Sequence, residues 1–115
     1  MMRRCFTAVL EQGNVYEVDF DTEPYEAGWA SEARWFIRIL GADASAAGVE
    51  LRPEISPDGL VWMADESAPV QVAARADSMA TCVQREFGNW LRLKVLFGDG
   101  APRKIKFLIY LALKE

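Results

Sequence analysis

Three carboxylates stand at alternate positions near the N-terminus: Asp19, Asp21 and Glu23. If the strand that begins near Tyr16 continues this far, all three side chains lie on one of its faces. A carboxylate pair can act as acid and base in a glycosidase, and three oxygen ligands can bind Ca²⁺. A solvated strand face has the same pattern and is the favoured interpretation. We therefore assign these residues no catalytic or metal-binding role.

The sequence contains no histidine. It thus lacks the commonest general base and the commonest transition-metal ligand. Its two cysteines, Cys5 and Cys82, are too few for a structural zinc site within one chain. No glycine-rich loop precedes a helical pattern, so nothing indicates nucleotide binding. We expect a protein that is not an enzyme and holds no cofactor or metal, with a carboxylate-based hydrolase as the least favoured alternative.

Alternation of apolar and charged residues predicts strands along most of the chain. The clearest segments are residues 16–20, 34–39, 49–55, 91–97 and 105–113, and weaker patterns mark residues 5–10, 60–63 and 69–75. The segment Gly98-Asp99-Gly100-Ala101-Pro102 carries turn residues between the last two strong strands. We therefore predict that residues 91–97 and 105–113 form a hairpin.

Two segments fit the strand pattern less well. Apolar residues between Asp77 and Gly88 also recur at helical spacing, with Asp77 as a candidate N-cap and Gly88 as a candidate stop. This segment can be a short helix or a strand. The small residues between Ala42 and Gly48 predict a loop.

Strand number and spacing predict an all-β fold, an antiparallel β-sandwich of about eight strands, jelly-roll-like, with at most one short helix. A chain of 115 residues with 51% hydrophobic residues suffices for one domain, residues 1–115. No apolar run approaches the roughly 20 residues of a membrane span, and the segment Met1–Phe6 does not resemble a secretion signal. We expect a cytoplasmic protein with free thiols.

Charge is divided unevenly along the chain. Residues 1–66 hold five basic and thirteen acidic residues, whereas residues 67–115 hold eight basic and four acidic ones. If the two parts present different surfaces, an acidic patch on one copy can meet a basic patch on the next. A sandwich also interleaves distant strands, so the charges can instead mix over the folded surface.

The basic C-terminal part offers candidate contact residues, Lys104 and Lys106. Together with Arg92, Lys94 and Arg103 they would form a stripe if the two strands were neighbours, as in sheets that bind single-stranded nucleic acid. The acidic pI of about 4.9 argues against a polyanionic partner. We predict no nucleic-acid binding and keep Lys104 and Lys106 as candidates for contact with another copy.

The aromatic residues Tyr25 and Trp29 lie in the loop-like segment of residues 23–29. The other tryptophans follow strand or turn patterns that predict packing roles. An exposed tyrosine and tryptophan can bind a sugar ring or form the centre of a protein interface. Tyr25 and Trp29 are therefore the aromatic candidates for interaction.

The most distinctive segment is Ser56-Pro57-Asp58-Gly59-Leu60-Val61-Trp62, in which Pro57 and Gly59 predict a tight turn. Together with Trp90-Leu91-Arg92-Leu93-Lys94-Val95, it resembles a pattern found in discoidin-like jelly-roll sandwiches and in phage and bacterial structural sandwich domains. The resemblance implies the sandwich itself, with Asp58 and Gly59 shaping the hairpin and Trp62 and Leu91 packing against it. Trp90 stands where those domains often have tyrosine. Function does not follow from such a fold.

These observations together favour a non-enzymatic structural or interaction subunit that self-associates into a homomeric assembly, such as a shell, a filament or a virion-type component. The alternative is a sandwich module that binds a carbohydrate or another ligand through Tyr25 and Trp29. In either case the partner is a protein or a carbohydrate, with neither nucleic acid nor a membrane span involved.

Overall fold

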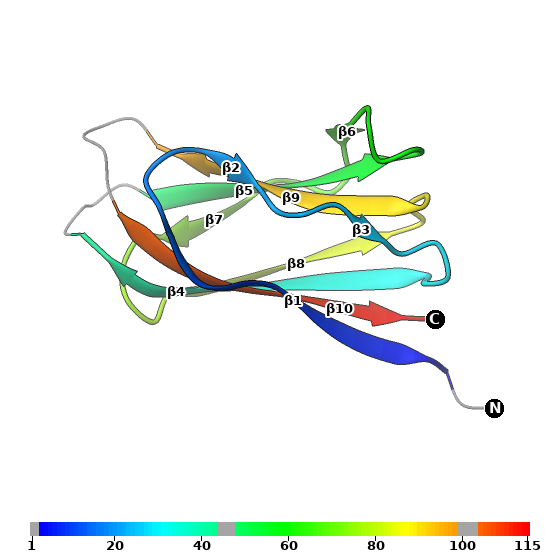
Figure 1. Cartoon of the computed structure of the whole chain (residues 1–115), viewed down its shortest axis with the longest axis horizontal. Coiled ribbons are helices and arrows are strands. Elements are labelled where there is room, and N and C mark those ends of the chain that lie inside the picture. The colour runs from blue at the N-terminus through cyan, green and yellow to red at the C-terminus, as the bar shows by residue number, and fades with distance from the viewer. Residues whose placement is uncertain (1–2, 44–47, 99–103) are drawn as a thin grey trace.

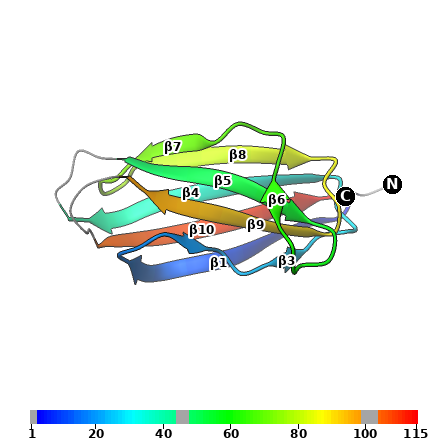
Figure 2. The same ribbon diagram turned by 90° about the horizontal axis from the view of Figure 1, so that it is seen from above.

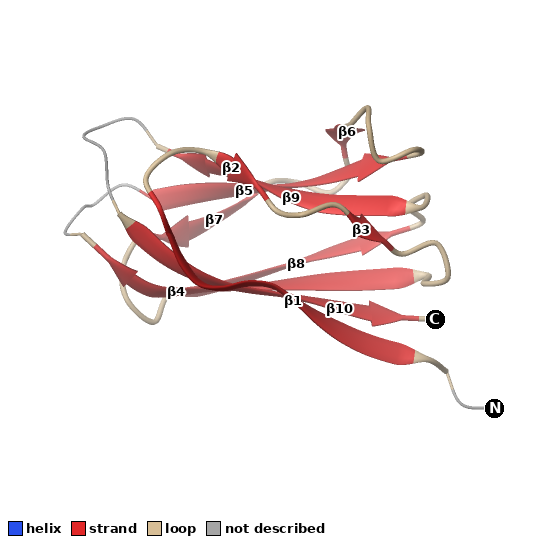
Figure 3. Cartoon of the chain, viewed as in Figure 1, coloured by secondary structure: helices blue, strands red, loops and turns tan. Residues whose placement is uncertain are grey.

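The computed structural model describes residues 3–43, 48–98 and 104–115, and in these ranges the regular structure consists of strands without a helix (Figure 3). Accordingly, no helix of the described part is long and apolar enough to cross a membrane. The strands are β1 (Cys5–Tyr16), β2 (Phe20–Asp21), β3 (Tyr25–Glu26), β4 (Glu32–Ala42), β5 (Gly48–Ser56), β6 (Met63–Ala64), β7 (Val70–Ala73), β8 (Met79–Arg85), β9 (Trp90–Phe97) and β10 (Ile105–Lys114).

The strands form two antiparallel sheets that face each other as two layers (Figure 1). The four-stranded sheet has the order β1-β10-β4-β8. The six-stranded sheet has the order β2-β9-β5-β6, with β3 also pairing with β9 and β7 also pairing with β5. The molecule measures 48 × 29 × 21 Å, and the strands run along its long axis (Figure 2). The predicted all-β antiparallel sandwich is confirmed.

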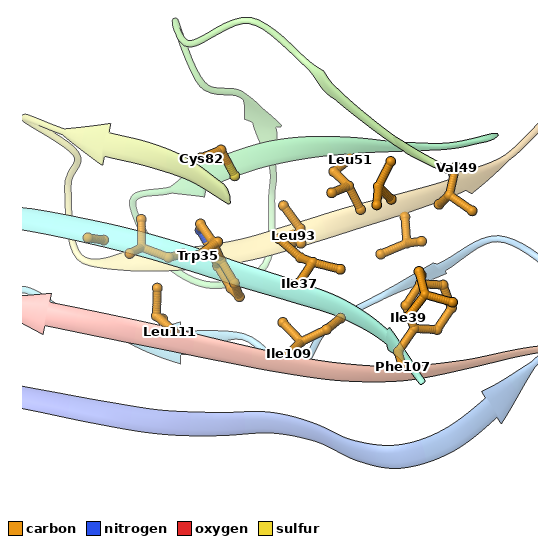
Figure 4. Close-up of a cluster of buried hydrophobic side chains, with 14 of the residues drawn as sticks. Trp35, Ile37, Ile39, Val49, Leu51, Cys82, Leu93, Phe107, Ile109 and Leu111 are labelled. Atoms are coloured by element: carbon orange, nitrogen blue, oxygen red, sulfur yellow. The ribbon is translucent and has the colours of Figure 1, made fainter. Parts of the chain in front are cut away.

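The hydrophobic core lies between the two sheets, where alternate residues of each strand point inward (Figure 4). Trp35, Ile37 and Ile39 of β4 are fully buried, as the alternation in residues 34–39 predicts. The inner faces of the other long strands supply the rest of the centre: Val49, Leu51, Leu91, Leu93, Val95, Ile105, Phe107, Ile109 and Leu111. The alternation of apolar and charged residues in the sequence therefore predicts correctly which residues of these strands point into the core.

One buried hydrogen bond between side chains links the neighbouring strands β4 and β8 on the inner side of the four-stranded sheet. The indole Nε1 of Trp35 donates to Oε1 of Gln84 at 2.7 Å, and both side chains are fully buried. The bond satisfies the polar atom of a tryptophan that is otherwise surrounded by hydrocarbon.

The turn at residues 56–62 joins β5 to β6, as the turn chemistry predicts. Oγ of Ser56 accepts hydrogen bonds from the backbone N–H groups of Gly59 at 2.8 Å and Asp58 at 3.3 Å. Gly59 has a positive φ of 79°, which glycine adopts without steric cost. The predicted strand at residues 60–63 is wrong in extent, because β6 is only Met63–Ala64 and the side chain of Leu60 is 82% exposed.

The predicted hairpin of residues 91–97 and 105–113 is wrong. Strand β9 lies in the six-stranded sheet and β10 in the four-stranded sheet, so the chain crosses from one layer to the other between them (Figure 1). Residues 44–47 of the predicted loop and residues 99–102 of the predicted turn at 98–102 lie outside the described residues. Each of the two strands has one apolar face. The apolar face of β9 and that of β10 are both buried in the core between the two sheets, so the two strands lie in opposite sheets and are not hydrogen-bonded neighbours.

Two further segments differ from prediction or resolve an ambiguity. Residues 16–20 are not one strand, because the chain bends at Glu17 and Val18, which leaves Val18 70% exposed. Tyr16 and Phe20 instead stack across the bend, with ring centroids 3.6 Å apart. The segment Asp77–Gly88 contains a strand, β8, and no helix.

Candidate functional site

The first candidate site is an aromatic hollow. Its lining comes from residues 4–6, from β3 and from the loop after β3, at the end of the sandwich where β10 ends (Figure 1). It has a volume of about 430 Å³ and is lined by Arg4, Cys5, Phe6, Tyr25 and Trp29. The structure thus brings together Tyr25 and Trp29, the two aromatic residues selected from the sequence. It adds the first residues of the described N-terminal segment, which the sequence did not associate with them.

Local contacts hold the loop that carries Trp29. The backbone N–H of Ala27 donates to the carbonyl of Asn89 at 2.7 Å, and that of Ala30 donates to the carbonyl of Ala27 at 3.0 Å. Gly28 fits closely here, because a Cβ at this position would lie 2.1 Å from Oδ1 of Asn89. The loop is therefore held against the turn before β9.

The side chains of the hollow also contact each other. The guanidinium of Arg4 lies 4.0 Å from the ring centroid of Trp29, within cation–π range. The rings of Phe6 and Tyr25 stack with centroids 6.5 Å apart, and Phe6 is 50% exposed. The hollow is therefore lined mainly by aromatic side chains, with the guanidinium of Arg4 beside them. Such a surface suits a ring or an apolar side chain of a partner.

The second candidate site is the outer face of the four-stranded sheet, here called the four-stranded face. Antiparallel partners point to the same side of a sheet, so the register defines its rows. The central row crosses all four strands as Val9, Tyr110, Phe36 and Thr81. The neighbouring rows add Leu108, Met79 and Val83, and the exposed fraction is 50% for Val9 and 64% for Met79.

Cations surround this apolar centre. The same register places five basic residues and one acidic residue on the four-stranded face: Arg34, Arg38, Arg85, Lys106, Lys114 and Glu32. Among the described residues, only one of these six side chains takes part in an ion pair, that between Arg38 and Asp77 at 2.8 Å. The four-stranded face is therefore both apolar and positively charged.

The outer face of the six-stranded sheet differs in character. Here Arg92 pairs with Glu54 at 2.6 Å and with Asp21 at 3.6 Å, and its guanidinium lies 4.4 Å from the ring centroid of Trp62. Arg52 pairs with Glu50 at 2.7 Å. This face is neutralised by its own ion pairs, whereas the four-stranded face is not. The two outer surfaces of the sandwich are therefore chemically unlike.

The predicted lysine pair is divided by the structure. Lys106 lies on the four-stranded face, opposite Val15 of β1. Lys104 lies just before β10, where its ammonium is 3.7 Å from a carboxylate oxygen of Glu17. Both lysines lie near the beginning of β10, whereas the aromatic hollow adjoins Phe6, which pairs with Leu113 near the end of that strand.

The basic stripe considered for nucleic acid does not exist, because Arg92 and Lys94 lie on the opposite sheet from Lys106. Both contribute instead to ion pairs with Asp21. Arg103 is outside the described residues.

The three alternate carboxylates do not form a joint site. Asp21 pairs with Arg92 and Lys94, and Oδ1 of Asp19 accepts the backbone N–H of Phe97 at 2.7 Å. No group of three cysteine, aspartate or glutamate side chains in the described residues is arranged to hold a metal ion. The bend after Tyr16 breaks the alternation on which the shared face depended.

Sequence reasoning missed the four-stranded face, although one signal for it was present. Arg34 and Arg38 alternate with the buried residues of β4, and Phe36 lies between them on the same outer side. A large aromatic residue at a position that alternation assigns to solvent indicates an exposed apolar patch. Tyr110 and Leu108 give the same signal on β10.

No protein-family model and no curated protein matches this chain. Among solved structures, it is similar to the SPBc2 prophage-derived protein YomS, with 7% identity over 100% of this chain and 96% of that one, and a TM-score of 0.60. A structure of Bacillus endospore appendages, a family of disulfide-linked pili, matches with 14% identity over 97% of this chain and 84% of that one, and a TM-score of 0.48.

A family two carbohydrate esterase from Cellvibrio japonicus matches 98% of this chain but 34% of its own, with 8% identity and a TM-score of 0.39. These last two likenesses are too weak to carry an argument. The likeness to YomS concerns the fold alone and does not address the motif at residues 56–62. The chain therefore shares a β-sandwich fold with a prophage-derived protein.

Proposed function

We propose that this chain is a non-enzymatic structural subunit that associates with further copies of itself into a shell, a filament or a virion-type component. The observation that carries the proposal is the four-stranded face. It has an apolar centre at Val9, Phe36 and Tyr110 and a rim of cations that form no ion pair within the described residues, apart from Arg38.

Exposed apolar patches with a polar rim mark interaction surfaces in soluble proteins. Aromatic residues and arginine are the types enriched at the centres of protein interfaces. The four-stranded face presents both types, whereas the six-stranded sheet uses its outer arginines in ion pairs within the chain. The prophage origin of YomS accords with a virion-type role, although that likeness is one of fold.

The proposal is tested by the absolute mass of the purified protein, measured by light scattering coupled to size exclusion near physiological salt. We expect a species heavier than the 12.9 kDa chain, with the mass rising with protein concentration. A variant with Val9→Ser and Phe36→Ser should shift the mass toward the monomer.

The matched control is Leu60→Ser with Val61→Ser, which removes two exposed apolar side chains from the turn before β6. This control should assemble as the unmodified chain does. A monomer at all concentrations for the unmodified chain would refute self-association.

A second candidate function is binding of a carbohydrate or another ligand in the aromatic hollow, favoured by the convergence of Phe6, Tyr25 and Trp29. Glycan binding by the unmodified chain that is lost with Trp29→Ala and retained with Trp62→Ala would support it. Binding unaffected by Trp29→Ala would exclude the hollow as the site.

A further inference from the structure

The charge of the four-stranded face restricts how two copies can meet. A two-fold contact of this face with itself would bring its five cations against the same five cations, with a single acidic residue per copy to offset them. Like charges that face each other across an interface oppose association. The partner of this face must therefore present negative charge.

The remainder of the same chain can supply that charge. The chain has thirteen basic and seventeen acidic residues, which leaves eight basic and sixteen acidic ones outside the four-stranded face. Residues 17–26 are the densest acidic stretch, with five carboxylates and no basic residue. They include β2 and β3, which pair with β9 at the edge of the six-stranded sheet.

Within this stretch, two carboxylates remain available for contact with a partner. Asp21 is neutralised by Arg92 and Lys94, and Glu17 lies beside Lys104. Asp19 accepts a hydrogen bond from the backbone N–H of Phe97. Glu23 and Glu26 are exposed and take part in no ion pair within the described residues.

These two carboxylates flank Tyr25, whose ring borders the aromatic hollow. This acidic edge, Glu23–Glu26, therefore combines negative charge with an aromatic side chain. The four-stranded face combines positive charge with an apolar centre.

We propose that the four-stranded face of one copy binds the acidic edge of the next copy, so that the chain associates head to tail. This inference rests on the self-association proposed above and adds its symmetry. The two surfaces lie on different sheets and share no residue, so one copy uses both at once. Contacts of this kind generate rings or open filaments rather than two-fold dimers.

The test uses two variants that each disable one surface. The face variant carries Arg34→Glu and Lys106→Glu, and the edge variant carries Glu23→Lys and Glu26→Lys. Each variant alone should be monomeric by light scattering where the unmodified chain is larger. Because the face variant keeps an acidic edge and the edge variant keeps a basic face, an equal mixture should form a dimer of twice the 12.9 kDa chain mass and grow no further.

Matched controls place the same charge changes elsewhere on the surface. Arg75→Glu and Glu66→Lys change exposed residues outside both surfaces and should leave assembly intact. Thermal unfolding of all variants checks that each folds as the unmodified chain does. Added salt should weaken the assembly, since it screens the charge contacts.

The outcomes separate this inference from the proposed function. A monomeric unmodified chain would refute self-association itself. An unmodified chain that assembles, with an edge variant that assembles equally well or a variant mixture that stays monomeric, would overturn the head-to-tail contact while self-association stands.

Discussion

The phenol oxygen of Tyr16 lies 2.5 Å from Oε1 of Glu11, a carboxylate that is only 6% exposed at the inner side of β1. The other carboxylate oxygen accepts a hydrogen bond from Nδ2 of Asn14 at 2.6 Å. Pairing with β10 is irregular between Val9 and Glu11 and again between Gln12 and Asn14. The bulged end of β1 is thus held by hydrogen bonds to a buried acid.

Tyr16→Phe should lower the free energy of unfolding by about 1–3 kcal/mol, because it removes a donor from a buried carboxylate. Urea unfolding at neutral pH measures the change. A variant as stable as the unmodified chain would show that the hydrogen bond contributes nothing net.

The same residue makes stability depend on pH. Burial, followed by the hydrogen bond to Glu11, raises the pKa of Tyr16 from 10.0 to about 12. The folded state thus favours the neutral phenol, so this contribution is complete below pH 10 and is lost as the pH rises toward 12. Urea unfolding at about pH 9 and about pH 11.5 should show a larger loss of stability for the unmodified chain than for Tyr16→Phe. Equal losses would contradict the assignment.

Gly59→Ala should destabilise the protein by about 1–2 kcal/mol, since the left-handed backbone is unfavourable for alanine. A Cβ at this position would also lie 3.1 Å from the indole ring of Trp90. Gly41→Ala is the control, because it adds a Cβ with no atom within 4 Å. In thermal unfolding, the first variant should melt below the unmodified chain and the second at or above it.

Ile109→Asp should destabilise the protein by more than about 3 kcal/mol, because it places an unpaired charge in the core. If that variant does not fold, Ile109→Ala tests the same position with an expected loss of about 2–5 kcal/mol. The control is Val61→Asp, at a side chain that is 72% exposed. The stability of each variant is measured by urea unfolding. If the core variants had the same unfolding midpoint as the unmodified chain, the inward face of β10 would be wrongly assigned.

The two thiols should differ in reactivity. Cys5 is exposed, whereas Cys82 is buried, and burial raises the pKa of Cys82 to about 12. Since the thiolate is the reactive form, a maleimide at neutral pH should label one thiol in the folded protein and two in denaturant. Labelling of Cys5→Ser in the folded state would show that Cys82 is accessible.

The sequence by itself determined which residues of each long strand point inward. Alternation identified Trp35, Ile37 and Ile109 as core residues, because a period of two along an extended chain separates the faces without reference to other strands. The turn at Ser56 and Gly59 was likewise predictable, since its hydrogen bonds and positive φ arise within a few residues.

Only the tertiary structure decided which strands are neighbours, because pairing depends on contacts between segments that are distant along the chain. It assigned β9 and β10 to different sheets and so divided the predicted basic stripe. It also brought Arg4 to Trp29, and it aligned Val9, Phe36 and Tyr110 in one row of the four-stranded face. These residues are close in space but far apart in sequence, so the alternation within any single strand cannot predict that they meet.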